Sequence, residues 1–340
     1  MTRDRRQPAE WEPHEACWAA WPSHAELWLD NLEPARRAHA TMDRAIAEGE
    51  RLELLVRSEA DEASARAALT GADVRYHRIA YGDIWLRDTA PIFTVEPAGG
   101  LTAVRFRFNG WGGKYLFSDD VVLSAQVAGA AHVADHELPI VLEGGAIDVD
   151  GEGTALTTRQ CLLNPNRNPG LDEAAYARHL APALGIARLV WLEDGLQNDH
   201  TDGHVDTIAR FVAPGVVACM EPAQGDPNRD ALARVIQSVG ATRDARGRAL
   251  EAALVPSPGA VVDADGALMP ASYLNFYIGN ATVVVPTYGA ANDDAAVAAV
   301  AALFPDRRTV GVDARAVLTG GGAFHCITQQ QPAVPAREER

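Results

Sequence analysis

Cysteine is scarce in this sequence of 340 residues, and the four that occur are Cys17, Cys161, Cys219 and Cys326. They are far apart and include no C-x-x-C pair, which excludes a disulfide framework and a zinc knuckle. Long apolar runs are also lacking, because no stretch approaches the roughly 20 residues that cross a bilayer. The basic start "MTRDRRQPAEWEP" has no apolar segment behind it, so it does not resemble a secretory signal. We therefore expect a cytoplasmic protein with reduced thiols and no membrane partner.

Basic residues are few relative to acidic ones. The chain has 30 Lys and Arg against 46 Asp and Glu, a formal net charge of −16. Such a surface is a poor partner for nucleic acid, which requires clustered positive charge, whereas a small cation would be attracted. An acidic surface that only keeps the protein soluble explains the same charge.

What is plentiful is a recurring local pattern of two short apolar strands around a tight turn. The last three of these hairpins are each followed by a helical stretch and a single strand. The four predicted hairpins span residues 90–108, 140–158, 204–220 and 272–289. A supersecondary unit that returns about every 60 residues predicts a ring or a solenoid.

The two ends of the chain supply the parts of one further unit. "ACWAAW" (16–21) reads as a strand near the amino end, and "FHCITQQ" (324–330) reads as a last strand without a hairpin partner. Pairing these two strands would close a ring of about five units. Without a Pro/Ser-rich linker, the chain reads as one domain, with a frayed tail over 333–340.

Chemically capable side chains stand at or near the starts of the predicted first strands. These residues are Asp88, Glu143, His204, Asp206 and Cys326. If each unit presents the same corner to a central axis, these groups converge. A cysteine near a histidine is a nucleophile-and-base pair. Two carboxylates would not help acyl transfer, where an oxyanion develops, but they match the N–H donors of a planar guanidinium. The pattern thus favours thiol-dependent attack on a guanidine carbon.

Several longer motifs resemble one known family over nearly the whole chain. They include "PAEWEPHEACWAAWP", "DIWLRDTAP", "FNGWGGKY", "LEGGAIDVDGEGTALTTRQCLLNPNRNP", "NDHTDGHVD", "ASYLNFYIGN" and "GGGAFHCITQQQP". They resemble the agmatine deiminase family of the guanidino-group modifying, or pentein, superfamily. The resemblance implies an α/β fold: a five-bladed propeller of ββαβ repeats with pseudo-fivefold symmetry, closed by pairing of the terminal strands. It implies a single catalytic domain over 8–332, with flexible termini at 1–7 and 333–340.

The same resemblance implies a role for each candidate. Cys326 would be the nucleophile and His204 the general acid and base. Asp88 and Asp206 would hold the guanidinium, and Glu143 would support His204 by a hydrogen bond to its ring. Agmatine and water would give N-carbamoylputrescine and ammonia through a covalent thiouronium, as in a route to putrescine. No metal or organic cofactor is implied, and the expected partner is a small cationic guanidino compound.

Some positions depart from the family pattern. His200 replaces an acidic residue in "NDHTDGH", and Ala323 and Phe324 precede the nucleophile in "GGGAFHC". We expect His200 and Phe324, together with Asp83 and Trp111, to contact the substrate beyond its guanidinium. These departures leave open another guanidino substrate, such as an N-modified agmatine or a specialised metabolite.

Other classes of protein also remain open. "HTDGHVD" offers His200, His204 and Asp206 as ligands of a metal-dependent amidohydrolase. A non-catalytic protein that binds polyamines or guanidines is a third possibility. Strands at the border of a ring can pair between subunits, so a homo-oligomer is open too. Cys17, Cys161 and Cys219 are expected to be small buried hydrophobic residues.

Overall fold

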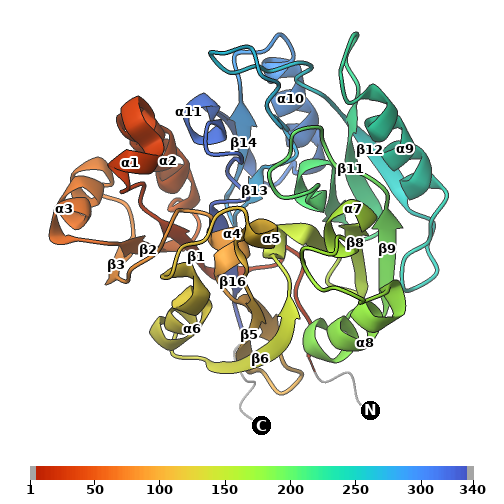
Figure 1. Ribbon diagram of the computed structural model, residues 1–340, viewed down its shortest axis with the longest axis horizontal. Helices are drawn as coiled ribbons and strands as arrows, with labels where there is room; N and C mark the ends of the chain where they lie inside the picture. Colours follow the sequence, from red (N-terminus) through yellow and green to blue (C-terminus); the bar gives the residue numbers. More distant parts are fainter. Residues whose placement is uncertain (1–4, 335–340) are drawn as a thin grey trace.

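The computed structural model describes residues 5–334. These residues form five separate small sheets. The sheets lie around the middle of the molecule, and the longer helices lie toward its outside (Figure 1). The expectation of a mixed α/β chain with a repeating small sheet is confirmed. Among the helices of this part of the chain, none is long and apolar enough to span a membrane.

Four of the five sheets share one order: an antiparallel pair of strands, then a third strand parallel to the second. Their strands are β4 (Ile92–Val95), β5 (Leu101–Arg107) and β6 (Ala134–Val141); β7 (Ile147–Val149), β8 (Thr154–Thr158) and β9 (Arg188–Leu192); β10 (Ala209–Ala213), β11 (Val216–Glu221) and β12 (Glu251–Pro256); β13 (Tyr277–Ile278), β14 (Thr282–Thr287) and β15 (Arg308–Asp313). The antiparallel pairs are the predicted hairpins. Each parallel pair is joined by a helix, as a parallel connection requires.

The fifth sheet joins the two ends of the chain. Its order is β16 (Thr328–Pro332), β1 (His14–Ala20), β2 (Arg51–Val56) and β3 (Val74–Arg78). β16 runs antiparallel to β1, with Trp18 opposite Gln329, and the Trp18 indole donates to Gln331 at 2.9 Å. The predicted pairing of the first and last strands is therefore confirmed. β3 is an additional parallel strand that the other four sheets lack.

The longer helices connect parallel strands. They are α2 (Leu32–Ile46), α3 (Glu59–Ala68), α6 (Asp120–Ala130), α8 (Glu173–Leu184), α9 (Arg229–Gly240) and α10 (Asp293–Leu303). Local chemistry explains their bounds: Asp172 caps the first turn of α8 by accepting from Ala175 N, and Gly185 ends it with a φ of +74°. In α9, buried Leu232, Val235 and Val239 form one apolar face.

Shorter helical turns lie between these elements. They are α1 (Ala25–Trp28), η1 (Leu29–Asn31), α4 (Leu86–Thr89), α5 (Gly110–Gly113), η2 (Gly144–Ala146), α7 (Arg159–Leu162), η3 (Val205–Thr207) and α11 (Arg315–Leu318). Three of them precede a hairpin: α4 stands before β4, η2 before β7 and η3 before β10. η2 and η3 lie within the predicted spans, so these two hairpins begin later than predicted. A helical turn changes the direction of the chain, and it brings side chains to a corner that a continuous strand would spread out.

The first hairpin continues into α6 and β6, which the sequence analysis did not predict. β6 is an edge strand whose first four residues are exposed, and Pro139 lies within it. Such a strand lacks the alternation of apolar and polar residues that marks a half-buried strand.

The described ends of the chain are held by backbone hydrogen bonds. Arg6 exchanges two of them with Val95, at 3.0 and 2.9 Å, and Gln7 N donates to Leu184 O at 2.9 Å. Ala333 N donates to Pro13 O at 2.8 Å. These bonds fall within the ends expected to be flexible, 1–7 and 333–340, whose residues 1–4 and 335–340 lie outside the described part.

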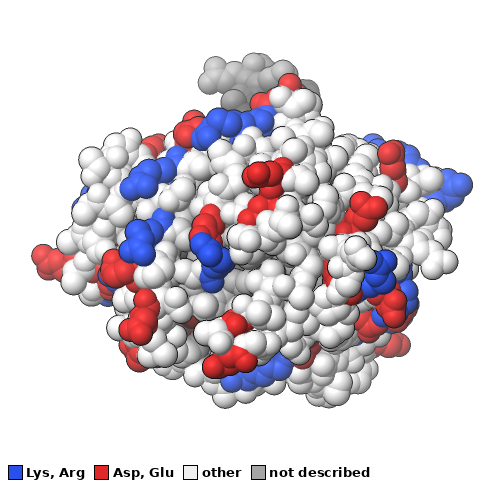
Figure 2. All heavy atoms as spheres, turned by 90° about the horizontal axis from the view of Figure 1, so that it is seen from above, with Lys and Arg blue, Asp and Glu red and all other residues white. Residues whose placement is uncertain are grey.

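Charged side chains of both signs are interspersed on the face shown in Figure 2. No continuous basic area appears among the coloured residues of this face, which agrees with the formal net charge of −16.

Trp18 is central to the strand pairing that joins the chain ends. It is 1 % exposed and stacks on His77 in addition to its bond to Gln331. Trp18→Ala is expected to lower the free energy of unfolding by about 3–5 kcal/mol, because it leaves a large cavity and an unpaired amide. Urea unfolding measures the change. The matched control is Leu116→Ala, at a side chain that is 74 % exposed, where a change within about 0.5 kcal/mol is expected. Equal losses in both variants would contradict a special role for the β1–β16 pair.

Candidate active site

The predicted chemical residues lie at the corners that precede the first strand of each sheet. Asp88 lies in α4, Glu143 precedes η2, His204 precedes η3 and Asp206 lies within it, and Cys326 stands two residues before β16. All five are buried, with exposed fractions between 0 and 6 %. The convergence that the repeat predicted is present, because contacts link these corners across the sheets.

Cys326 is held by residues from two other corners. Asn275, which precedes β13, donates through Nδ2 to Cys326 Sγ at 3.1 Å, and its Oδ1 accepts from Cys326 N at 3.2 Å. The thiol lies 3.7 Å from Asp206 Oδ2. Burial, followed by the Asp206 and Asp88 carboxylates, raises the pKa of Cys326 well above its usual value of 9.0. In the empty site the group is a neutral thiol.

Asn275 lies at the fifth corner, for which the sequence analysis found no candidate residue. Candidate groups were found in four units only, and the gap between His204 and Cys326 spanned about two units. Asn275 falls in that gap, within the quoted "ASYLNFYIGN". Its position in the repeat was the available signal, but an amide is chemically less conspicuous than a thiol or an imidazole.

Asp88 is oriented by two donors. Its Oδ1 accepts from Gly145 N at 3.0 Å, and its Oδ2 accepts from the Trp111 indole at 2.8 Å. Trp111 has a φ of +53°, an uncommon conformation for a bulky residue, and the neighbouring Asn109 side chain accepts from Gly112 N. Trp111 therefore acts on the Asp88 carboxylate as well as bordering the site.

The His204 ring is fully buried and makes no hydrogen bond within residues 5–334 through either nitrogen. Asp88 Oδ1 lies 3.8 Å from its Nδ1. Burial by itself lowers the pKa of His204, but Asp88, with Cys161 and Glu143, outweighs burial and raises it well above its usual value of 6.5. At neutral pH the ring is an imidazolium.

Glu143 does not hydrogen-bond His204 as expected. Its Oε1 accepts from Arg167 Nε at 2.6 Å, and its Oε2 is buried with no partner in the described chain. Both Glu143 and Arg167 are fully buried at their side chains. Glu143 therefore acts on His204 through its charge, since it contributes to the raised pKa of the ring.

The histidine beside the nucleophile, His325, lies between two carboxylates. The His325 ring faces Asp206 Oδ2 at 2.7 Å through Nδ1 and Glu10 Oε2 at 2.8 Å through Nε2. Neither His325 nor Glu10 was predicted as a site residue. Both are buried, at 2 % and 6 % exposure. Burial alone would raise the pKa of Asp206, but the hydrogen bond and charge of His325 hold it below its usual value.

A cavity of about 200 Å³ opens onto Cys326 and Asp88. Trp85, Trp111, Tyr115 and Phe117 give it aromatic walls. The volume and the polar end of this cavity suit a small molecule with an apolar stem.

Only some of the residues expected to contact the rest of the substrate line this cavity. Asp83, Trp111 and His200 line the cavity. Both oxygens of Asp83 accept from indoles, those of Trp28 and Trp85. His200 is exposed and lies 3.3 Å through Nδ1 from the Tyr115 hydroxyl. Phe324 instead is 0 % exposed and packs in the hydrophobic core, so it does not shape the entrance as expected. Residues 324–327 form a turn rather than a strand, so side chains two positions apart need not share a face.

The proposed amidohydrolase ligands do not form a metal cluster. His200 is exposed at the rim, while Asp206 Oδ2 is paired with His325. Across the described residues, the group whose ligand atoms lie within 4.8 Å of one another is Glu143, Cys161 and His204. Cys161 is a buried member of a hydrophobic core cluster, as predicted, and it also lies beside the catalytic candidates Glu143 and His204.

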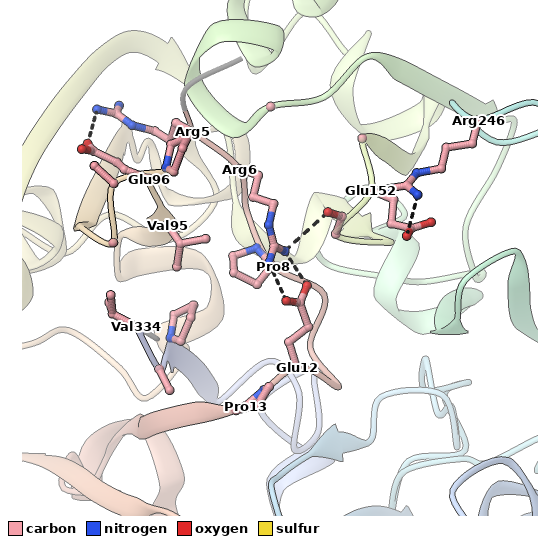
Figure 3. Close-up of a pocket in the computed structure, with 18 residues that line it drawn as sticks. Arg5, Arg6, Pro8, Glu12, Pro13, Val95, Glu96, Glu152, Arg246 and Val334 are labelled. Atoms are coloured by element: carbon pink, nitrogen blue, oxygen red, sulfur yellow. Dashed lines mark hydrogen bonds and ion pairs between the residues drawn. The ribbon is translucent and has the colours of Figure 1, made fainter. Parts of the chain in front are cut away.

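A larger cavity, of about 830 Å³, lies where the described ends of the chain meet (Figure 3). Its charged side chains are paired with one another: Arg5 with Glu96, Arg6 with Glu12, and Arg246 with Glu152. The described residues that line it include no cysteine or histidine. It therefore lacks the nucleophile and the proton-transfer group of the smaller cavity.

Gly145 allows the corners to approach one another. A Cβ at this position would lie 2.6 Å from His204 Nδ1 and 3.0 and 3.1 Å from the Asp88 and Asp206 carboxylates. Gly145→Ala is expected to displace these groups and to reduce kcat/KM by at least about a hundredfold. Gly129→Ala, at a helical position with nothing within 4 Å, is the matched control and should keep activity. Normal kcat/KM in Gly145→Ala would contradict the close approach.

Comparison with known proteins agrees with this site. The family model for Porphyromonas-type peptidyl-arginine deiminase matches residues 6–332. A putative agmatine deiminase of Legionella pneumophila (strain Paris) is 40 % identical over 329 residues, covering 96 % of this chain and 94 % of the relative. An agmatine deiminase of Pseudomonas aeruginosa (strain LESB58) is 37 % identical and covers 96 % and 95 %.

A solved structure is similar in three dimensions as well. The agmatine deiminase of Enterococcus faecalis superposes with a TM-score of 0.92 at 34 % identity, covering 97 % of this chain and 96 % of the other. With a family model that spans nearly all of the chain, and relatives that match it over nearly their whole length, the chain belongs to the Porphyromonas-type peptidyl-arginine deiminase family, in which it is similar to agmatine deiminases.

Proposed function

We propose that this protein is a hydrolase of linear amidines that converts agmatine and water into N-carbamoylputrescine and ammonia. The observation that supports this most is the meeting of Cys326 with buried His204, Asp88 and Asp206 at the end of a small cavity. The relatives that carry the name agmatine deiminase match the chain over nearly its full length.

A guanidinium would match the hydrogen-bond acceptors that face the thiol. The Asp88 and Asp206 carboxylates lie near the thiol, and Asp206 Oδ1 is buried without a partner among the described residues. A planar guanidinium offers five N–H donors and can bond both carboxylates at once. A neutral amide offers fewer donors in a fixed fork, so a guanidinium is favoured.

Binding of the cation would also activate the nucleophile. The two carboxylates are among the causes of the raised pKa of Cys326, so neutralising them lowers that pKa. The resting site, with a neutral thiol and an imidazolium, becomes reactive when substrate binds. This order protects the thiol from other reactions while the site is empty.

Two half-reactions follow. When the cation binds, the Cys326 thiol releases its proton to solvent. The thiolate then forms an S–C bond to the guanidine carbon, the C–N bond to one amino group breaks, and His204 gives its proton to the departing ammonia. This leaves a covalent thiouronium and a neutral imidazole. Water then attacks the same carbon and gives one proton to His204. The S–C bond breaks, the remaining hydroxyl proton passes to the sulfur, and the neutral ureido product leaves.

The distal part of the substrate would lie along the aromatic walls. Trp111 would pack on the methylene stem, and Asp83 would attract the far ammonium group. His200 would meet the substrate at the rim, beside Tyr115. An N-modified agmatine or another guanidino compound is the second candidate substrate, favoured by this imidazole at the rim.

For the molecule as a whole we propose a five-bladed propeller built as one catalytic domain over 8–332. The shared strand order of four sheets and the β1–β16 pairing support it. A small cationic guanidino compound is the proposed partner, in a cytoplasmic setting, and a homo-oligomer through border strands remains compatible with this ring.

Ammonia release from agmatine, arginine, N-acetylagmatine, guanidinobutyrate and methylguanidine tests the function. Agmatine is expected to have the highest kcat/KM, and Cys326→Ala should lower turnover at least about a thousandfold, because it removes the nucleophile. Cys219→Ala, at another buried cysteine, is the matched control and should retain activity. Turnover by Cys326→Ala would contradict the mechanism, and silence on every guanidine would contradict the function.

The pH profile tests the pairing of Asp88 with His204. Because Asp88 raises the pKa of His204, the imidazolium persists above pH 6.5 and is lost as pH rises through the raised value. Asp88→Asn should therefore move the alkaline limb of kcat/KM to lower pH, in addition to weakening substrate binding.

Asp83→Asn is the control for this profile, since Asp83 also lines the cavity and is not among the groups that raise the pKa of His204. It should change KM without moving the alkaline limb. An unmoved limb in Asp88→Asn would mean that another group sets the protonation of His204.

A further inference from the structure

His325 connects two buried carboxylates that come from distant parts of the chain. Its Nδ1 faces Asp206 Oδ2 at 2.7 Å and its Nε2 faces Glu10 Oε2 at 2.8 Å. Asp206 belongs to η3, while Glu10 lies in the amino-terminal segment before β1. The ring is 2 % exposed, so water does not compete for these two contacts.

The hydrogen-bond partners of the His325 ring indicate how many of its nitrogens carry a proton. A neutral imidazole has one N–H, and an ionised carboxylate can only accept. With a carboxylate oxygen within 2.8 Å of each nitrogen, a neutral ring would place one nitrogen lone pair against an anion. Both contacts are satisfied together only when both nitrogens carry a proton.

The carboxylates themselves are held in the ionised form. Glu10 Oε2 lies 3.3 Å from Arg87 Nη2 and 3.1 Å from Arg210 Nη2, and Glu10 Oε1 accepts from Ile278 N. Burial acts to raise the pKa of Glu10, but Arg210, His325 and Arg87 together hold it well below its usual value. A proton shared with Glu10 is therefore not an alternative to the imidazolium.

The charges around the ring balance. Arg210 Nε also pairs with Asp148 at 2.6 Å, and Arg87 Nε donates to the backbone oxygen of His325 at 3.2 Å. Three cationic side chains and three carboxylates then alternate through the network, which ends at the thiol: Arg87, Arg210 and His325 with Glu10, Asp148 and Asp206, beside Cys326. A neutral His325 would leave one buried negative charge uncompensated next to Cys326.

We propose that His325 donates from both ring nitrogens, to Asp206 and to Glu10, and thereby positions Asp206 and directs its free oxygen toward the ligand, with Glu10 as the residue that holds the ring. Asp206 Oδ2 is engaged by His325, so Oδ1, which has no partner in the described chain, faces no competitor for a ligand N–H. His325 and Glu10 are thus positioning residues, and the amino-terminal segment is part of the support of the active site.

The protonation can be measured without any substrate. The chain has 10 histidines, and ring-nitrogen NMR on protein labelled at histidine distinguishes an imidazolium from a neutral ring. The resonances that vanish in His325→Asn are expected to show two protonated nitrogens at neutral pH. In Glu10→Gln the same ring should carry one bare nitrogen at that pH, because the amide keeps the oxygen but removes the charge.

The catalytic consequence rests on the proposed deimination and is measured separately. His325→Asn removes the hydrogen bond and the charge that lower the pKa of Asp206. The acid limb of the kcat/KM profile should therefore move to higher pH by about one unit or more, which is about a tenfold loss of kcat/KM at a fixed pH on that limb. Glu10→Gln should move it in the same direction, and it serves as the test if His325→Asn does not fold.

The matched control is His39→Asn. His39 is also fully buried, and it faces one carboxylate, Asp43, at 2.8 Å within α2. This variant should lower thermal stability without moving the acid limb. The proposal is overturned if the His325 ring carries one bare nitrogen at neutral pH, or if His325→Asn lowers kcat/KM by the same factor at every pH.

Discussion

Buried negative charge is the constraint on which the rest of this structure depends. Glu10, Asp88, Glu143, Asp148 and Asp206 lie at 8 % exposure or less near the middle of the molecule. An ionised carboxylate in such a place is stable only when cations and N–H donors surround it. Arg167, Arg210, Arg87 and His325 lie against these carboxylates, and Asp88 lies beside His204. After burial, the Asp206 and Asp88 carboxylates are the largest causes that raise the pKa of the Cys326 thiol.

These groups are brought together by turns of the backbone before several strands, and not by one helix or one strand. Each corner is a short turn at the start of a first strand, so one geometry is used five times, with a different side chain each time. Asn275 orients the thiol, Asp88 and Asp206 flank it, and His204 lies behind Gly145, which has no side chain to separate them. The strand pair β1–β16 joins the two ends of the chain, and Glu10, which precedes β1, lies beside His325, which precedes β16.

Much of this arrangement could be predicted from the sequence, because the repeated hairpins mark where the strands lie and the reactive side chains mark the corners before them. Apolar strands around Gly-rich turns marked the four hairpins, and the unpaired strands at the two ends predicted the closing sheet. Cys326 stood out as a thiol behind glycines at a repeat position. The failures have physical reasons as well. β6 is an exposed edge strand without alternation. Phe324 neighbours the nucleophile in sequence, yet its side chain points into the core.

The sequence by itself determined the repeat, the class of fold and the set of reactive groups, since these depend on residue type and spacing along the chain. Only the tertiary structure decided which groups touch. Glu143 pairs with Arg167 instead of the His204 ring, and the histidine next to Cys326 turns away to bridge Asp206 and Glu10. Partners from 24 to 315 residues apart become neighbours only in the folded chain, and burial then makes each of those contacts decisive for charge.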